Sequence, residues 1–305
     1  MADHAANVSG PPEILHGYYS DGAVLDEIHY LECKIILKPE RFSSAQSFQD
    51  FGDLVQRAAD KFDIERDFKC VAGVRPSLRE VMFLDTADFR LYNNSFILRQ
   101  RVAYEDHFPI GDPEMVFKFR HPDYRKAAEL DVRPKFAGDY RIKFKAEALP
   151  LRDQIGGYRL LYSHNAQFGL SVLPEGDRGS IGFLGQVFPA LAALRASADE
   201  RVEYVHQEVV EEVLQELGVL DFGKGITARC NIALWRTRAE HRPLCGEFAY
   251  QAKFRRRDES GEKALDRCKR FFIALQQIGH DWVALGTTKT GIVYQLSGHP
   301  AQTQE

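Results

Sequence analysis

Pairs of basic side chains stand two residues apart in two neighbouring segments of the sequence, at Arg99 with Arg101 and at Lys118 with Arg120. Successive side chains of a β-strand point to opposite faces, so each pair shares one face while the apolar residues beside it take the other. Neighbouring strands lie about 4.8 Å apart, so two such pairs side by side build a dense basic patch. Like charges this close repel one another unless an anion binds between them. The spacing therefore indicates a site for phosphate or another polyanion.

Carboxylates follow the same alternation in two further segments. Glu32 and Lys34 share the polar face of a strand predicted over 28–38, and Glu129, Asp131 and Arg133 share the polar face of one predicted over 129–133. Further strands are predicted over 81–86, 96–104 and 114–120. If all these polar faces turn inward, the strands form a closed barrel lined with charge, which suits a charged ligand. The alternative is a half-open α+β sheet whose charged faces meet water.

The other elements follow from hydrophobic periodicity and turn residues. A helix that Ser43 or Ser44 caps is expected to run to about Phe62, and apolar residues at helical spacing predict further helices. The Arg141, Lys143 and Lys145 segment fits a strand or the start of a helix, but we favour a solvated run of charge. The remaining predictions are a mainly helical segment over 183–194, helices over 203–217 and 262–278, strands over 219–222, 226–238 and 247–255, and a short helix or strand over 287–296.

These elements suggest one domain over residues 25–296, with a partly helical insertion at about 150–200. Turn signals such as Gly156-Gly157 mark the insertion, and residues 1–24 and 297–305 are expected to be tails. Arg229 on the predicted strand over 226–238 and Lys253 on that over 247–255 extend the basic faces.

Composition limits the class of partner. The 305 residues are 44% hydrophobic, enough for a sizeable core, and the net charge is −4. A protein without a global basic excess is a poor partner for double-stranded nucleic acid, so the local basic patch favours a small, highly charged ligand. Five scattered cysteines without CxxC spacing argue against a zinc site or disulfide framework. With no secretory signal and no apolar run long enough for a membrane span, we expect a cytoplasmic protein that does not bind membranes.

The central segment resembles the CYTH family, the triphosphate tunnel metalloenzymes. Residues 83–91, FLDTADFRL, followed by FILRQR at 96–101, are similar to the family's YFDT-x-D-x-x-L and ALRIR motifs. MVFKFR at 115–120 is similar to the next family strand, Glu129-Leu130-Asp131 to the acidic strand after it, and Tyr30-Leu31-Glu32-Cys33-Lys34 to the ExExK signature. The resemblance extends from about residue 28 to 133 and is weak beyond.

The resemblance implies an α+β fold, an eight-stranded antiparallel β-barrel with helices packed outside, whose tunnel binds triphosphate together with Mg²⁺ or Mn²⁺. Family members include inorganic triphosphatases, thiamine triphosphatases and class IV adenylate cyclases. Two departures weaken the metal site. Tyr30 stands where ExExK has its first Glu, and the late G-x-F-x-E-x-E strand is GEFAYQA at 246–252, where only Glu247 could substitute for the missing carboxylates.

The candidate site joins the basic and acidic faces. We expect Lys34, Arg99, Arg101, Lys118 and Arg120 to bind phosphate oxygens, with Arg133, Arg229 and Lys253 as further ligands. Glu32, Glu129 and Asp131 are the candidate metal ligands, and Glu32, Lys34 and Glu129 the candidate catalytic residues. Alternatively, the acidic groups only pair with the basic ones and hold an empty tunnel together.

Three functions remain open. The first is a metal-dependent phosphohydrolase acting on inorganic, nucleoside or thiamine triphosphate, and cyclase activity is less expected. The second is a catalytically degenerate protein of the same fold that binds polyphosphate or a nucleotide. The third is an interaction protein that uses the 150–200 segment.

Overall fold

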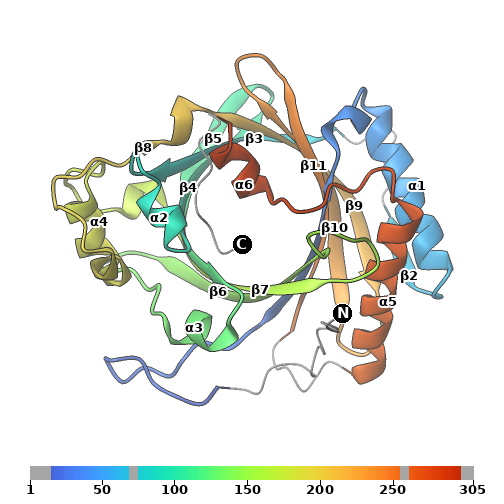
Figure 1. Cartoon of the computed structure of the whole chain (residues 1–305), viewed down its shortest axis with the longest axis horizontal. Coiled ribbons are helices and arrows are strands. Elements are labelled where there is room, and N and C mark those ends of the chain that lie inside the picture. The colour runs from blue at the N-terminus through green and yellow to red at the C-terminus, as the bar shows by residue number, and fades with distance from the viewer. Residues whose placement is uncertain (1–14, 69–74, 255–260, 297–305) are drawn as a thin grey trace, which may run out of the picture.

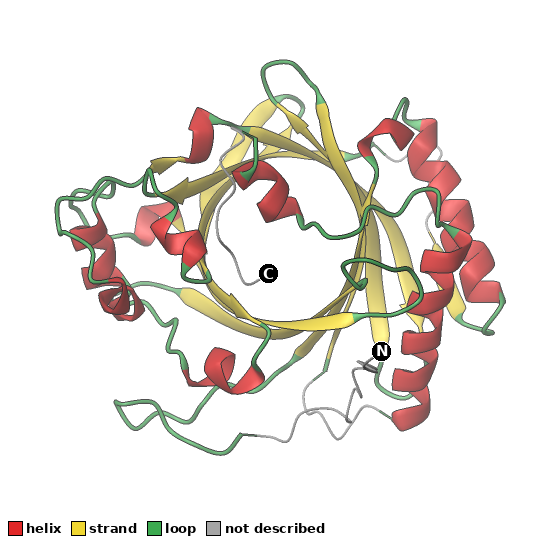
Figure 2. Cartoon of the chain, viewed as in Figure 1, coloured by secondary structure: helices red, strands yellow, loops and turns green. Residues whose placement is uncertain are grey.

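The structure is a computed structural model of the 305-residue chain, and it describes residues 15–68, 75–254 and 261–296. Strands close into a ring in Figure 1, and Figure 2 shows most helices outside that ring. Cys70, Arg255 and the predicted tail 297–305 lie outside the described residues. In the part that the structure describes, no helix combines the length and apolarity needed to cross a membrane.

Nine strands form the closed barrel, in the order β9-β10-β11-β1-β6-β7-β5-β4-β3, and β3 pairs back onto β9. The closing pairs run from Ser77 opposite Leu214 to Val81 opposite Val210. Two short strands, β2 (Glu65–Phe68) and β8 (Glu203–Tyr204), add to β9 and β3 outside the ring. The barrel strands are β1 (Tyr30–Leu37), β3 (Ser77–Asp85), β4 (Phe96–Glu105), β5 (Phe108–His121), β6 (Tyr140–Leu149), β7 (Arg159–Gly169), β9 (Val210–Asp221), β10 (Thr227–Thr237) and β11 (Pro243–Lys253).

The barrel with helices outside confirms the predicted fold class, with two differences. The ring has nine strands where the resemblance implied eight, and β1 pairs with β6 in parallel while the other barrel neighbours are antiparallel. A parallel pair needs a long connection. Here that connection is the chain from β1 through β3, β4 and β5 to β6. The chain thus returns to β1 with β6 and places the two strands side by side in the same direction.

Two long helices cover the outer faces of β1, β9, β10 and β11. In α1 (Gln46–Asp60), buried residues such as Phe48, Phe51 and Val55 recur at helical spacing, and α5 (Glu262–Ile278) buries Phe271 in the same way. Their rings join the outward-facing side chains of these strands in one core. Each fully buried side chain of this size contributes about 1.5–3 kcal/mol, so this packing helps to hold the barrel strands in register. The boundaries of α5 match the predicted helix.

The opposite outer wall carries shorter elements. The helices α2 (Arg90–Asn93), α3 (Tyr124–Glu129) and α4 (Ile181–Val187) lie outside the ring in Figure 1. A second core of outward-facing residues from β4, β5, β6 and β7 packs against α3, α4 and the 3-10 segment Pro189–Leu194. Part of the predicted N-terminal tail also packs here, because Tyr19 is buried and its hydroxyl lies 3.0 Å from Asp26 Oδ2.

One end of the barrel interior is apolar. Inward-facing Ile36, Phe83, Ile97 and Trp235 form a buried cluster there with Tyr294 of α6 (Lys289–Tyr294). In Figure 1, α6 lies within the outline of the ring rather than outside it. The helix therefore resolves the prediction for 287–296, and it brings its first residue to the edge of the charged interior.

Two predictions of local structure are wrong. Residues 203–217, predicted as a helix, form β8, a 3-10 turn and much of β9. Valines four residues apart share one face of a strand as well as of a helix, and β-branched side chains favour the strand. Ser43 and Ser44 do not cap α1, whose N-cap position is Ala45 without a side-chain bond. The predicted insertion over 150–200 does contain helical elements, α4 and Pro189–Leu194, but it also contains β7, a barrel strand between β5 and β6.

Two further predictions concern charged segments. Residues 129–133 are not a strand: Asp123 caps α3 by accepting a hydrogen bond from the Lys126 N–H, the helix extends to Glu129, and the chain then continues as a loop. The favoured solvated run at Arg141–Lys145 is also wrong, because these residues belong to β6. Their alternation with apolar residues was that of a barrel strand with one face inward.

Candidate functional site: a charged barrel interior

The inner faces of the strands bring charged side chains together. Cys33 and Ile35 of β1 belong to the outer core, so Glu32 and Lys34, which alternate with them along the strand, point inward. Phe117 and Phe119 of β5 likewise belong to the outer core opposite Lys118 and Arg120, whose side chains are buried inside. The strict alternation of strands thus produces the inward charge that the sequence predicted.

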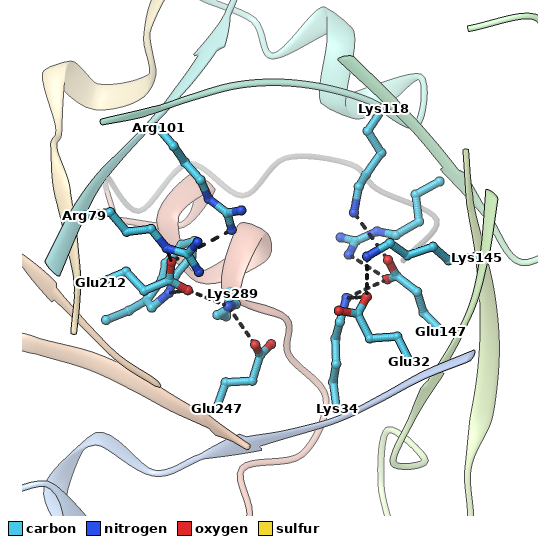
Figure 3. Close-up of polar contacts among 12 residues, drawn as sticks. Glu32, Lys34, Arg79, Arg101, Lys118, Lys145, Glu147, Glu212, Glu247 and Lys289 are labelled. Atoms are coloured by element: carbon cyan, nitrogen blue, oxygen red, sulfur yellow. Dashed lines mark hydrogen bonds and ion pairs between the residues drawn. The ribbon is translucent and has the colours of Figure 1, made fainter. Parts of the chain in front are cut away.

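The first cluster surrounds Glu147 of β6, which is 0% exposed. Its carboxylate lies 3.1 Å from Lys34 Nζ, 3.4 Å from Lys118 Nζ and 3.6 Å from Arg120 Nη1. Figure 3 shows Lys34, Lys118 and Glu147 pointing toward one another across the interior. Their proximity keeps Glu147 ionised, because the lysines and the arginine outweigh the effect of burial and lower its pKa.

Glu32 completes the first cluster, since it faces Glu147 in the β1–β6 register. Its Oε2 lies 2.9 Å from Lys34 Nζ and 3.3 Å from Lys145 Nζ, and Lys145 also donates to Gln251 at 2.7 Å. Burial alone would raise the pKa of Glu32, but Lys145 and Lys34 lower it to about 2. Lys34 therefore bridges two carboxylates that stay ionised.

The second cluster surrounds Glu212 of β9. It accepts a hydrogen bond from Trp235 Nε1 at 2.9 Å and pairs with Arg79, with Arg101 at 3.9 Å and with Lys289 at 3.2 Å. Lys289 Nζ is also 2.7 Å from Glu247 Oε1 of β11. In Figure 3 this cluster lies across the interior from the first, and again one lysine bridges two glutamates.

Cations outnumber carboxylates in these two clusters and on the strand faces between them. Burial and the charge of Arg101 lower the pKa of Arg99 to about 9, and the structure gives Arg99 no ion pair with a described residue. Burial, together with Arg120, Lys34 and Arg99, lowers the pKa of Lys118 to about 7 although Glu147 opposes the shift. Five carboxylates, Glu32, Glu114, Glu147, Glu212 and Glu247, face eight cations, Lys34, Arg79, Arg99, Arg101, Lys118, Arg120, Lys145 and Lys289.

Two guanidinium nitrogens inside the barrel lack acceptors. The Nε atoms of Arg99 and Arg101 are buried, and neither has a hydrogen-bond partner in the described part of the chain. A buried donor without a partner costs about 1–3 kcal/mol. An anion bound between the clusters would satisfy both donors and offset the excess positive charge.

Five of the predicted phosphate ligands, Lys34, Arg99, Arg101, Lys118 and Arg120, come together inside the barrel. Arg229 and Lys253 lie on inner faces of β10 and β11 but are exposed, away from the apolar end.

The other three predicted site residues lie elsewhere. Glu129 on α3 pairs with Arg125 at 3.8 Å, and Arg133 pairs with Asp131 at 2.6 Å and with Asp21 at 3.0 Å. With the predicted strand over 129–133 absent, these residues have no inner barrel face to occupy. We therefore no longer place Glu129, Asp131 and Arg133 with Glu32.

Sequence reasoning missed several residues of the interior. Lys145 was within reach, because Arg141, Lys143 and Lys145 alternate with apolar residues, but the favoured interpretation placed this run in solvent. Glu147, two residues further on, continues the same alternation. Arg79 precedes the segment that was recognised as a strand, and Glu212 lies where a helix was predicted. Lys289 gave no signal, since its place depends on how α6 packs.

The fit to a divalent metal is partial. Glu32 and Glu147 are adjacent carboxylates, and Mg²⁺ needs only one or two carboxylates when phosphates and water supply the other ligands. Across residues 15–68, 75–254 and 261–296, however, no three His, Cys, Asp or Glu side chains gather as a metal site. Each carboxylate pair is instead bridged by a lysine ammonium.

Comparisons with known proteins give distant structural likenesses. No family model matches the chain, and no curated protein matches it. A candidate adenylyl cyclase from Hippeastrum, described as having a dominant triphosphatase activity, is 13% identical over 89% of this chain and 96% of that one, with a TM-score of 0.42. A candidate adenylate cyclase from Bacillus halodurans is 12% identical over 86% and 95%, with a TM-score of 0.38. Likenesses at these values do not establish what this chain binds.

Proposed function

We propose that this protein is a divalent-metal-dependent phosphohydrolase of the triphosphate tunnel type, acting on inorganic, nucleoside or thiamine triphosphate. The observation that carries the proposal is the charge imbalance inside the barrel, where eight cations face five carboxylates. A linear triphosphate brings several negative charges in a narrow shape. It therefore matches an interior whose cations lie on two facing walls.

The chain's own residues hold and orient the phosphates. Lys118 and Arg120 on one side and Arg99 and Arg101 on the next strand supply charge-assisted hydrogen bonds, and Arg is suited to bidentate contact with phosphate. Arg79, which the sequence analysis missed, lies beside Arg101 at the second cluster. Fixed hydrogen-bond donors from several strands align the phosphates of the substrate and stabilise the charge that develops on the transferred phosphoryl group.

Glu32 and Glu147 are the residues that would hold Mg²⁺ or Mn²⁺, since they are neighbouring ionised carboxylates beside the phosphate-binding cations. A metal there would neutralise charge on the phosphates and position a water for attack. Lys34 and Lys145, which now pair with these carboxylates, would turn to phosphate oxygens when the substrate binds. The substrate thus exchanges one set of charge partners for another.

A second function, binding without turnover, is favoured by two specific observations. Tyr30 replaces the first carboxylate of ExExK, and each of the five interior carboxylates is paired with a lysine or arginine. A protein of this kind would keep the cations that bind phosphate and lack the metal needed for hydrolysis.

A phosphate-release screen separates the two functions. Inorganic triphosphate, ATP, GTP and thiamine triphosphate are tested with Mg²⁺ and with Mn²⁺, alongside Glu147→Gln and the control Glu129→Gln, which changes an exposed carboxylate outside the barrel. Hydrolysis that is lost in Glu147→Gln and kept in Glu129→Gln supports the phosphohydrolase. Tight triphosphate binding without release under either metal supports the binding protein, and Tyr30→Glu is then the first variant in which turnover is sought. No binding at all contradicts both.

A further inference from the structure

The two ends of the barrel interior differ in chemistry. At the end where β1 finishes, inward-facing apolar side chains pack against α6 and fill the interior with core. At the end where β1 starts, the inner faces are basic. Tyr30, the first residue of β1, lies opposite Lys253 of β11 and Lys145 of β6. A ligand that reaches the charged clusters therefore approaches from the Tyr30 end.

Three lysines surround the Tyr30 ring. Lys143, Lys145 and Lys253 place their ammonium groups 5.9, 5.8 and 5.8 Å from the ring centre. Contacts at this distance are weak cation–π interactions and do not offset the mutual repulsion of three charges. The position that would carry a metal-binding carboxylate in the resembled family thus carries a group of cations here.

The basic face of β6 connects this end to the first cluster. Arg141, Lys143 and Lys145 follow one another on the inner face, and Glu147 of the first cluster is next in line. Burial and the neighbouring charge of Lys145 lower the pKa of Lys143. Among described residues, the structure shows no ion pair for Arg141, Lys143 or Lys253. We name the set Tyr30, Arg141, Lys143, Lys145 and Lys253 the basic rim.

We propose that the basic rim is an additional phosphate subsite, so that the barrel takes linear phosphate chains longer than a triphosphate. The inference rests on the proposed function, because it assumes that the inner clusters hold phosphates. Since the other end is filled by apolar core, a longer chain can extend only toward the rim. Two carboxylates act on the rim lysines, and both already pair with other cations: Glu114 with Arg101, and Glu32 with Lys34 and Lys145. An aromatic base would instead need the face of Tyr30, over which the lysines already lie.

Isothermal titration calorimetry with tripolyphosphate and with a longer linear polyphosphate of defined length tests the subsite. The wild-type protein is expected to bind the longer chain at least about tenfold more tightly per site, because two further charge-assisted contacts form. The Arg141→Gln/Lys143→Gln variant should lose this gain and keep its tripolyphosphate affinity within about twofold. Lys126→Gln/Lys263→Gln, which removes two exposed lysines on α3 and α5, serves as the matched control and should keep the gain.

The outcomes distinguish this inference from the proposed function. Equal wild-type affinity for both chains, or equal weakening of both in the rim variant, overturns the subsite and leaves triphosphate binding intact. Binding of neither chain overturns both proposals. ATP that binds more tightly than tripolyphosphate, with the gain lost in Tyr30→Ala, assigns the rim to an aromatic base and overturns the phosphate subsite.

Discussion

The two charged clusters have the same central arrangement, a lysine between two glutamates, but the lysines reach it by different routes. Lys34 lies on the same strand as Glu32, two residues away, and its position is fixed by the barrel itself. Lys289 comes from α6, which is no part of the barrel wall. The first cluster is therefore as rigid as the sheet, while the second depends on how a short helix packs. The comparison predicts that the first cluster matters more for stability and the second more readily exchanges its cation.

The largest expected effect is on the first cluster. Glu147→Gln leaves Lys34, Lys118 and Arg120 buried without their shared carboxylate, and breaking a buried charge network in this way costs about 3–5 kcal/mol. Glu212→Gln should cost less, because its partner Arg79 is 30% exposed in its side chain and can turn to water. Urea unfolding of both variants checks the order. Tripolyphosphate should raise the free energy of unfolding of Glu147→Gln by more than that of the wild type. Equal losses of stability in Glu147→Gln and Glu212→Gln would contradict the comparison of the two clusters.

The second cluster should gain a metal site when its lysine is removed. In Lys289→Met, Glu247 keeps no ion-pair partner among the described residues, although Glu212 keeps Arg79 and Arg101. One carboxylate of the pair therefore becomes available to a divalent cation. Without phosphate, this variant is expected to bind one more Mn²⁺ than the wild type. At an Mn²⁺ concentration of about 100 times Kd the added stability is about 2.7 kcal/mol.

Lys34→Met is the matched control for that titration. In this variant Glu32 keeps its ion pair with Lys145 and Glu147 keeps its ion pair with Lys118, so neither carboxylate becomes available to the metal. Electron paramagnetic resonance of Mn²⁺ counts the bound ions in each variant. An additional ion in Lys34→Met, or none in Lys289→Met, would show that the origin of the lysine does not decide which pair is exchangeable.

The next effect comes from the protonation of Lys118. It changes the free energy of unfolding, or of phosphate binding, by about 1.4 kcal/mol per pH unit, which is tenfold in affinity for phosphate. Its pKa is about 7 in the folded chain against 10.5 as an ordinary value, so between these pH values the unfolded chain binds the extra proton. Stability from this residue therefore rises with pH across that window. Phosphate binding has the opposite dependence, because the anion favours the protonated lysine.

Calorimetry in two buffers of different ionisation enthalpy measures this linkage. At about pH 8, tripolyphosphate binding should take up close to one proton, and at about pH 6 almost none. Lys118→Met should abolish the uptake, while Lys34→Met should keep it because the neighbouring carboxylates Glu147 and Glu32 raise the pKa of Lys34 against the effect of burial. Uptake that persists in Lys118→Met would assign the proton to another group.

The sequence predicted those features of the site that follow from the alternation of side chains along a strand. Arg99, Arg101, Lys118 and Arg120 could be placed on inner faces because basic and apolar residues alternate around them, and the barrel followed from several such faces. Where periods coincide, prediction failed: valines spaced four apart fit a helix or β9.

Contacts that depend on distant parts of the chain were not predictable. Nothing in the sequence indicates that Glu147 lies beside Glu32 inside the barrel, because a parallel pairing across more than 100 residues has no local signal. Lys289 meets Glu212 and Glu247 only through the packing of α6. The resemblance to a known acidic strand placed Glu129 and Asp131 in the site, but a helix with an Asp123 cap formed there instead.

The smallest expected effect tests the helix that holds Lys289. Tyr294 at the end of α6 donates a hydrogen bond of 3.0 Å to the buried carboxylate of Asp85, and its ring stacks on Tyr92 with a centroid distance of 4.0 Å. Tyr294→Phe keeps the ring and removes only the hydroxyl, which should cost about 1 kcal/mol in urea unfolding. Tyr204→Phe removes a hydroxyl whose bond to Gln100 is exposed, and it should change stability by less than about 0.5 kcal/mol.

The same variant connects stability to the exchange of cations. If the bond to Asp85 helps to fix α6, a looser helix presents Lys289 to its two glutamates less often, and Mn²⁺ competes better for them. In the Mn²⁺ titration, Tyr294→Phe should therefore lie between the wild type and Lys289→Met, with an additional ion bound at lower affinity than in Lys289→Met. A titration identical to the wild type would mean that ring packing alone holds α6. The second cluster would then be as rigid as the first, and the contrast between a strand-borne and a helix-borne lysine would fail.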